Sequence, residues 1–251
     1  MGYTQVMLSH LFNVALYQPL YNGFIGLIAA FPWLDAGVVV ILFTVLIKLV
    51  LFPLSQKSVR SQLEIKRLQP EIDDLKLKFK DNKQEQALRT MKLYKERGVN
   101  PFSGVVLALI QLPILIALYM VFYRGGLDVI HTETLYSFIK VPAQIDKMFL
   151  GLIDITTKST VMAVLVAVGQ FFQIRFTMPP KPAAKSDEKK TLSFQDELSK
   201  NMSFQMKYIM PVFMFFVARS LPSLVSLYLI TSSVFAVGQE IYTKKKINNT
   251  N

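Results

Sequence analysis

One basic residue stands out among the side chains that could do chemistry. Lys48 lies within the apolar stretch FTVLIKLVLFPL, which starts at Phe43. An ammonium group in hydrocarbon costs about 2.5–3.5 kcal/mol on insertion scales. Pro53 marks the expected end of this helix, about 7.5 Å beyond Lys48 at about 1.5 Å per residue. Two interpretations therefore remain open: a functional cation, and a lysine whose flexible stem carries its charge to the headgroups.

Uncharged polar residues occur at similar depth in the same stretch and in the other apolar segments. Such side chains face a bundle interior or a wet cavity, because lipid offers no hydrogen-bond partners. Gln111 also fits a hydrogen bond between helices. With Lys48, these residues form the predicted hydrophilic substrate groove: Thr44, Gln111, Gln170, Gln173, Ser226, Thr231 and Ser233.

Signals of enzyme chemistry are absent from the sequence. The chain has no cysteine, and its two histidines, His10 and His131, lie far apart. It has no P-loop, no nucleophile elbow and no paired carboxylates within an apolar segment. We therefore expect no catalytic residues, no metal site and no cofactor.

The composition predicts an all-α membrane protein. Hydrophobic residues make up 52% of the 251 residues and charged residues only 18%, against about a quarter in soluble domains. A spanning helix needs about 20 apolar residues. Residues 1–35 contain an apolar segment interrupted by polar residues, which we interpret as an interfacial amphipathic helix anchored by Trp33; a sixth span is the alternative. Five transmembrane helices are predicted at 36–54, 101–123, 159–177, 204–219 and 222–240.

The distribution of Lys and Arg predicts the orientation. The first 47 residues contain neither, and the loop 124–158 balances basic with acidic residues. Basic residues gather in segments 55–100, 178–203 and 241–251, and the positive-inside rule places such segments in the cytoplasm. Five spans, with the N-terminus outside and the C-terminus inside, satisfy this pattern, whereas six do not. The net charge of +11 therefore reports orientation, and no specific nucleic-acid partner is predicted.

Segment 55–100 is predicted to form a cytoplasmic helical hairpin with its turn at Lys80–Lys83 and its end at Gly98. The hairpin could be a solvated spacer, or it could touch anionic headgroups or a ribosome. Residues at helical spacing give the two arms apolar faces: Leu68, Ile72, Leu75 and Phe79 on the first, and Leu88, Met91 and Tyr94 on the second.

Three stretches resemble the signature blocks of the YidC-type membrane protein insertases, bacterial relatives of the mitochondrial and thylakoid insertases. They begin at Leu46 (LIKLVLFPLSQKSVRSQLEIKRLQPEIDDLKLKF), Met91 (MKLYKERGVNPFSGVVLALIQLPILIALYMVF) and Tyr208 (YIMPVFMFFVARSLPSLVSLYLITSSV). The resemblance extends from about Val38 to about Gln239, in order and with matching spacing.

The resemblance implies a multi-pass protein of the bacterial plasma (inner) membrane. Such an insertase and chaperone receives nascent membrane proteins in a positively charged groove open to the cytoplasm, without nucleotide hydrolysis. The implied partners are these substrates, the ribosome, the Sec translocon and anionic lipid headgroups. Lys48 lies where the family carries a groove arginine. Lysine keeps the charge but lacks the planar fork of five donors, so only a mechanism that needs a point charge is retained.

Met202, Met206, Met210 and Met214 recur every four residues. Ordinary packing explains this spacing, but flexible thioethers also suit varied substrates. Met206, Met210 and Met214 are accordingly a predicted substrate-contact surface. Two other function classes fit the spans: a small transporter or channel that uses the polar groove, and a passive scaffold. The lack of an internal repeat argues against most secondary transporters.

Overall fold

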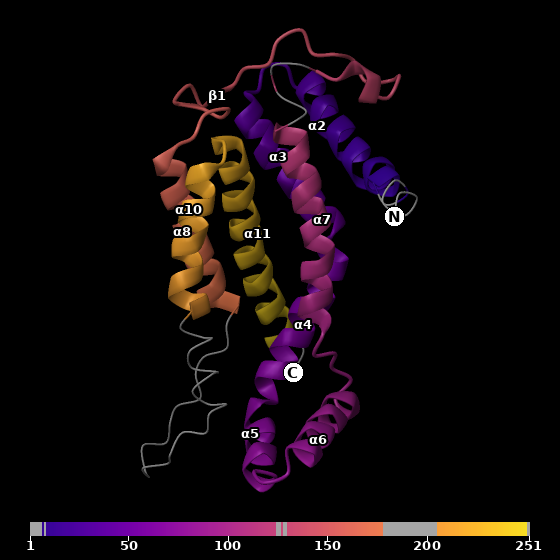
Figure 1. Ribbon diagram of the computed structural model, residues 1–251, viewed down its shortest axis with the longest axis vertical. Coiled ribbons are helices and arrows are strands. Elements are labelled where there is room, and N and C mark those ends of the chain that lie inside the picture. Colours follow the sequence, from indigo (N-terminus) through magenta and orange to yellow (C-terminus); the bar gives the residue numbers. More distant parts are fainter. Residues whose placement is uncertain (1–6, 8, 124–126, 128–129, 178–204, 250–251) are drawn as a thin grey trace. The chain divides into compact units, whose positions relative to one another are not determined.

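The computed structural model describes residues 7, 9–123, 127, 130–177 and 205–249, and most of them are helical (Figure 1). The first half contains η1 (Asn13–Tyr17), α2 (Gln18–Ala30), α3 (Ala36–Val50), α4 (Phe52–Arg67), α5 (Gln69–Lys78), α6 (Lys83–Glu96) and α7 (Ser103–Tyr123). The second half contains η2 (Thr132–Thr134), β1 (Met148–Phe149), β2 (Ile153–Asp154), α8 (Thr160–Thr177), η3 (Gln205–Ile209), α10 (Met210–Ser220) and α11 (Ser223–Asn248).

The predicted helical class is confirmed, and the described residues include candidate membrane spans. Among the described residues, α8 and the Ser223–Ile247 part of α11 are long and apolar enough to cross a membrane. A third span results if the bent pair α3 and α4 is counted as one, and the apolar part of α7, Leu109–Phe122, is shorter. The number of five spans and their orientation stay predictions. The predicted linker 178–203 lies outside the described residues.

The chain forms two compact units. Unit 1 consists of Met1–Lys48 and Pro113–Gly238, and unit 2 consists of Leu49–Leu112 and Gln239–Asn251. The helices α3, α7 and α11 each begin in one unit and end in the other.

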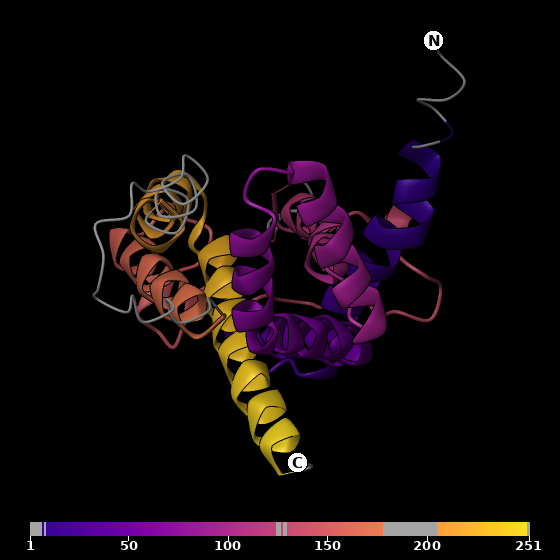
Figure 2. The ribbon, with the colours of Figure 1, turned by 90° about the horizontal axis from the view of Figure 1, so that it is seen from below.

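Aromatic and small residues make the core of unit 1. The Phe24 ring lies 5.7 Å from the Phe43 ring and 5.3 Å from the Phe122 ring, which joins α2 to α3 and α7. A second cluster is built on Ala163, Val166 and Ala218, whose small or β-branched side chains let α8 and α10 approach closely. Figure 2 shows these two helices side by side.

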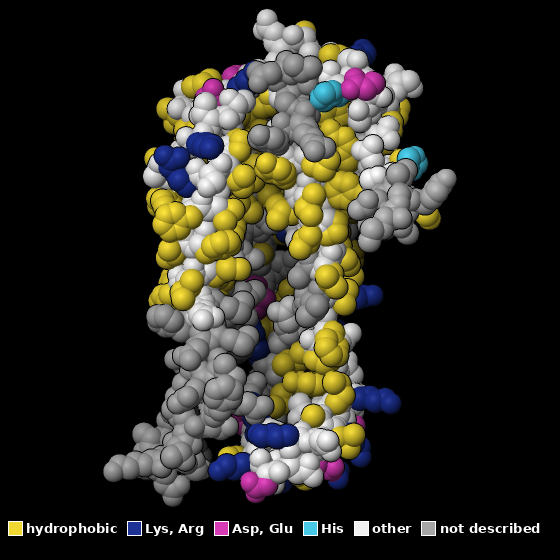
Figure 3. Space-filling view, viewed as in Figure 1, with side chains coloured by type: hydrophobic (Ala, Val, Ile, Leu, Met, Phe, Trp, Pro, Cys, Tyr) yellow, Lys and Arg dark blue, Asp and Glu magenta, His cyan; other side chains and the backbone are white. Residues whose placement is uncertain are grey.

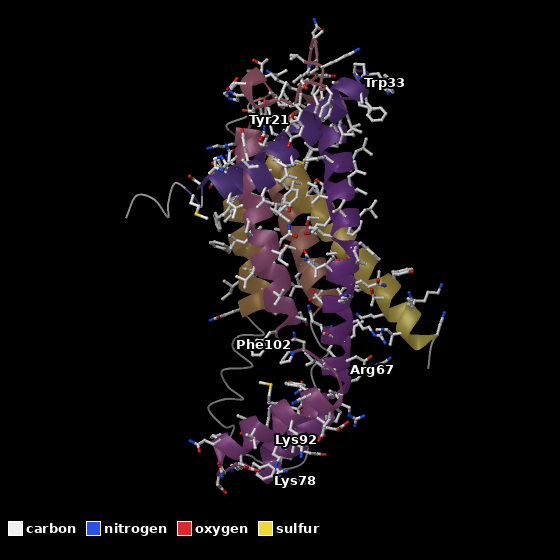
Figure 4. All side chains as sticks on the ribbon, turned by 90° about the vertical axis from the view of Figure 1, so that its right-hand side faces the viewer. Tyr21, Trp33, Arg67, Lys78, Lys92 and Phe102 are labelled. Atoms are coloured by element: carbon white, nitrogen blue, oxygen red, sulfur yellow. The ribbon has the colours of Figure 1, made fainter. Side chains whose placement is uncertain are left out.

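The N-terminal helix packs one face against the protein. The buried residues of η1 and α2 follow helical spacing and include Tyr17, Tyr21, Phe24 and Ile28. Beyond the end of α2, Trp33 is 74% exposed and its ring points away from the helices (Figure 4). An exposed tryptophan suits an anchor at a membrane surface. That this helix lies along the membrane stays a prediction.

In unit 2, α5 and α6 form a helical hairpin, with Lys78 and Lys92 on its surface (Figure 4). The Asn82 side chain caps α6 by accepting from the Glu85 amide at 3.1 Å, and Gly98 ends the hairpin at φ +64°. Leu68 and Ile72 are buried as expected, whereas Leu88 and Met91 are exposed. The second arm's apolar face is therefore largely unpacked. Its packed residues are the half-buried Leu93 and Tyr94.

Candidate functional site

Lys48 lies in the last turn of α3, and its side chain is half-buried. The exposed residues of this helix are all apolar and form a stripe: Leu42, Leu46, Leu49 and Val50. At about 100° per residue, Lys48 lies on the face opposite to Leu46. A lysine that only reached the headgroups would fit equally well on the exposed stripe. Its position therefore favours a cation held on the protein side of the helix.

Thr44 lies one turn before Lys48 on the same face. It is buried, and its hydroxyl donates to the Val40 carbonyl oxygen at 2.7 Å. The hydroxyl of Thr231, on α11, likewise donates to the Leu227 carbonyl oxygen at 2.8 Å. These two groups are satisfied within their own helices, so neither needs water. Hydrogen bonding alone does not assign them to a groove.

The helices α8 and α11 approach each other in unit 1, near some of their polar residues. A Cβ atom at Gly169 would lie 3.5 Å from the Ser233 Cβ atom, so the two helices approach closely there. Gln170 follows Gly169 directly and is half-buried, as is Gln173 one turn later. Ser226 lies two turns before Ser233 on the same face of α11. Its hydroxyl is buried without a hydrogen-bond partner among the described residues.

Gln111 belongs to unit 2, whereas Lys48 and the other predicted groove residues belong to unit 1. Gln111 is half-buried on α7. The structure thus places Lys48 and Thr44 on one face of α3, and it places Gly169, the neighbour of Gln170 in α8, near Ser233 of α11. A single groove lined by all eight residues stays a prediction.

The predicted methionine surface divides into different environments. Met210 is exposed, but Met214 packs against the Ala163, Val166 and Ala218 cluster. The side chain of Met206 and the whole of Met202 lie outside the described parts. Figure 3 shows many apolar side chains on the visible face of α8 and α10. Phe213 of α10 is exposed.

Two polar clusters were missed by sequence reasoning. In unit 1, Asn22 is 1% exposed and joins α2 to the loop around Thr134 and Tyr136. Its Nδ2 atom donates to the carbonyl oxygens of Gln18 and Thr134 at 2.8 and 2.9 Å, and its Oδ1 atom accepts from the Tyr136 amide at 2.6 Å. The available signal was an asparagine among apolar helical positions. In the sequence it is only a polar interruption of the apolar segment.

The second cluster fixes the end of α11 to α4 in unit 2. The Glu240 carboxylate is 2% exposed, and its Oε1 atom lies 3.5 Å from Lys66 Nζ and 3.3 Å from Lys244 Nζ. The Gln239 Nε2 atom donates to the Ser55 hydroxyl at 2.6 Å. Burial lowers the pKa of Lys66, and the Glu240 charge opposes that shift. The four-residue spacing of Glu240 and Lys244 was the sequence signal for an ion pair.

Within the described residues, no cluster of three His, Asp or Glu side chains is placed to hold a metal ion.

Comparison with known proteins adds a family relationship. Residues 28–250 match the family described as 60Kd inner membrane protein. A protein of Clostridium tetani named membrane protein insertase YidC is 33% identical over 239 residues, which cover 95% of each chain. A Fusobacterium nucleatum protein of the same name is 34% identical over 84% of this chain and 86% of its own. A longer Anaeromyxobacter relative, also so named, is 31% identical over 84% of this chain and 33% of its own.

Proposed function

The chain belongs to the 60Kd inner membrane protein family, and we propose on this basis that it is a membrane protein insertase. The observation that carries the proposal is the match over 223 of 251 residues (28 to 250), together with relatives named as insertases. Its substrates would be nascent membrane proteins. The ribosome, the Sec translocon and anionic headgroups would be its partners, as the resemblance implies.

In this proposal the protein has five spans, with the basic hairpin 55–100 and the tail 241–251 in the cytoplasm. The charge distribution supports this orientation, because every strongly basic segment then lies on the same side. The helices α8 and α11 supply the third and fifth spans, and α3 begins the first.

Lys48 would provide the positive charge of a groove open to the cytoplasm. Its half-buried position, opposite the exposed stripe of α3, supports this role. A substrate's short acidic tail would enter the groove and be attracted by the ammonium group. A water-containing groove shortens the path of the polar tail through hydrocarbon, which lowers the barrier to its transfer.

The substrate's apolar segment would leave sideways along the exposed surfaces of α8 and α10. Transfer of apolar surface into lipid yields roughly 25 cal/mol per Å², or tens of kcal/mol for a spanning helix. That free energy exceeds the cost of moving a short polar tail. The process therefore requires no nucleotide hydrolysis.

A Lys48 series tests the electrostatic role. We expect Lys48→Arg to preserve insertion of a single-span substrate with an acidic tail, because the charge remains. Lys48→Ala and Lys48→Glu should slow insertion about tenfold or more, equivalent to ~1.4 kcal/mol or more. The measurement is protease protection of the translocated tail in proteoliposomes.

Lys57→Ala is the matched control, since Lys57 is an exposed lysine on the following helix. A substrate whose tail has been neutralised should respond less to Lys48→Glu than the acidic substrate does. Equal insertion of the acidic substrate by all variants would contradict the role of Lys48. Failure of the parent protein to insert any substrate would contradict the insertase function itself.

A further inference from the structure

A small β-hairpin precedes α8 in unit 1. Met148 pairs with Asp154 and Phe149 pairs with Ile153 in an antiparallel register. Leu150, Gly151 and Leu152 connect the two strands, and Figure 1 shows the hairpin at one end of the unit 1 helices.

At the tip of this hairpin, a leucine adopts a backbone conformation that is unfavourable for its residue type. Leu150 has φ +53° and Gly151 has φ +70°, and Leu150 is the one non-glycine residue with positive φ in the described part of the chain. Consecutive residues with positive φ favour Asn-Gly, because asparagine tolerates this conformation better than leucine. A leucine in this conformation is strained, which points to a role for its side chain.

The start of α3 holds one side of the hairpin in place. A Cβ atom at Gly37 would lie 2.5 Å from the Phe149 ring, so Phe149 packs directly on the α3 backbone. The Leu150 amide donates to Asp35 Oδ2 at 3.2 Å, and the Ala36 amide donates to the Asp146 carbonyl oxygen at 2.8 Å. The tip is therefore presented in a fixed orientation.

Side chains that point away from this anchor are apolar and exposed. Met148 is 41% exposed, Leu150 is 63% exposed and Leu152 is 79% exposed. A cluster of this kind at the tip of a fixed hairpin marks a contact surface rather than scattered surface residues.

Two neighbours indicate that lipid covers this tip. Trp33, with its exposed ring, lies at the top of Figure 4, and β1 is labelled at the same end of unit 1 in Figure 1. The helix α8 starts six residues after the hairpin, and its exposed residues Val161, Val164 and Leu165 are apolar from the first turn. Exposed Thr156, Thr157 and Lys158 separate the tip from this candidate membrane span, so the tip lies just beyond the start of the span in the sequence.

We propose that Leu150 and Leu152 insert into the lipid interface at this end of the spans. Together with Trp33 they set the depth of unit 1 in the bilayer. Transfer of the two leucine side chains out of water is favourable and opposes the strain of the turn. This inference needs only a membrane location and is independent of the insertase function.

Tryptophan fluorescence tests the proposal, because Trp33 is the chain's only tryptophan. Leu152→Trp in a Trp33→Phe background is reconstituted in phosphatidylcholine and phosphatidylglycerol vesicles. We expect blue-shifted emission, and quenching by lipids brominated near the headgroup at least twofold stronger than for Gln144→Trp in the same background. Gln144 is an exposed polar residue of the same loop and is the matched control.

A second variant separates lipid contact from folding. Leu150→Asn suits the positive φ, so the Leu152→Trp reporter protein should melt at an unchanged or higher temperature while its quenching by brominated lipid falls. Emission typical of water, with full quenching by iodide, would overturn the proposal. Blue-shifted emission without quenching by brominated lipid would also overturn it, because the tip would then contact protein.

Discussion

Asn22 links the N-terminal helix to the connecting loop (residues 130–158) through a single side chain. Its amide uses two donors and one acceptor inside an apolar environment, where unpaired polar groups are costly. The neighbouring Tyr21 adds a further link, since its hydroxyl accepts from the His131 amide at 2.8 Å. The side chains of these two residues therefore attach α2 to backbone groups of the loop.

Replacement of Asn22 by alanine should destabilise unit 1 by about 2–4 kcal/mol, because the Tyr136 amide and the Thr134 carbonyl lose a buried partner. Thermal unfolding in detergent and the rate of proteolysis within the connecting loop measure the effect. Asn13→Ala is the control, since Asn13 is exposed on η1. A melting temperature equal to that of the parent would show that water replaces these bonds.

At the scale of elements, helical periodicity and turn-forming residues predicted some helix boundaries but not others: α3 ends at Val50 rather than at residue 54, and α11 continues to Asn248 rather than ending at residue 240. The third apolar segment was expected at 159–177 and α8 covers Thr160–Thr177, while the KDNK turn and Gly98 bound α6 as expected. Contacts between distant segments could not be predicted in this way. Nothing in the spacing of Asn22 names Thr134 as its partner, and nothing in the hairpin sequence places Phe149 on Gly37.

For the candidate site, the sequence identified the polar residues within the apolar segments but not their hydrogen-bond partners. Thr44 and Thr231 use carbonyls of their own helices, whereas Ser226 has no partner among the described residues. A sequence does not distinguish a hydroxyl bonded within its own helix from a buried hydroxyl without a partner, because both appear as a Ser or Thr among apolar residues.

The contact between α3 and the β-hairpin should be sensitive to one methyl group. Gly37→Ala places a Cβ atom 2.5–2.8 Å from Phe149, which must then shift. We expect a loss of about 1–3 kcal/mol in the free energy of unfolding. Phe149→Ala in the same chain should make the Gly37→Ala change nearly neutral, which a double-mutant cycle measures.

Gly238→Ala is the control for this cycle. A Cβ atom at Gly238, in α11, has no neighbour within 4 Å, so alanine should be neutral or stabilise by up to about 1 kcal/mol. If Gly37→Ala behaves like Gly238→Ala, then Phe149 does not pack on α3 in the folded protein.

At the scale of the whole molecule, the two units share helices, and each has its own polar attachment. Asn22 attaches the connecting loop in unit 1, and Glu240 attaches the end of α11 to α4 in unit 2. Both are buried polar groups remote from Lys48 in the sequence. Stability therefore depends on residues other than those proposed for the groove. Mutations can change one without changing the other.

Glu240→Ala should loosen the C-terminal end of α11 in unit 2. The loss in the free energy of unfolding should stay below the ~3–5 kcal/mol for breaking a fully buried ion pair, because Lys66 is 15% exposed and Lys244 is 40% exposed. Tryptic cleavage at Lys244–Lys246 should accelerate, as followed by mass spectrometry. Glu96→Ala, which removes an exposed partner of Lys92, should change cleavage at this site little.

The pH dependence of this variant has a defined sign. Without Glu240, burial and the positive charge of Lys244 both act on Lys66 unopposed, so its pKa in the folded state is lowered further. The unfolded state then binds more protons, so stability rises with pH between the folded and unfolded pKa values of Lys66. The deficit of Glu240→Ala relative to the parent should shrink as pH is raised toward 10. A deficit that grows with pH would contradict this account.

The bonds around Asn22 also bear on how far the chain can be shortened. Deletion of residues 1–35 would remove a segment that contains no lysine or arginine. It would leave every candidate groove residue in place. It would nevertheless strip the backbone groups of His131, Thr134 and Tyr136 of their partners. The smallest autonomous piece of this architecture therefore begins upstream of its first apolar span.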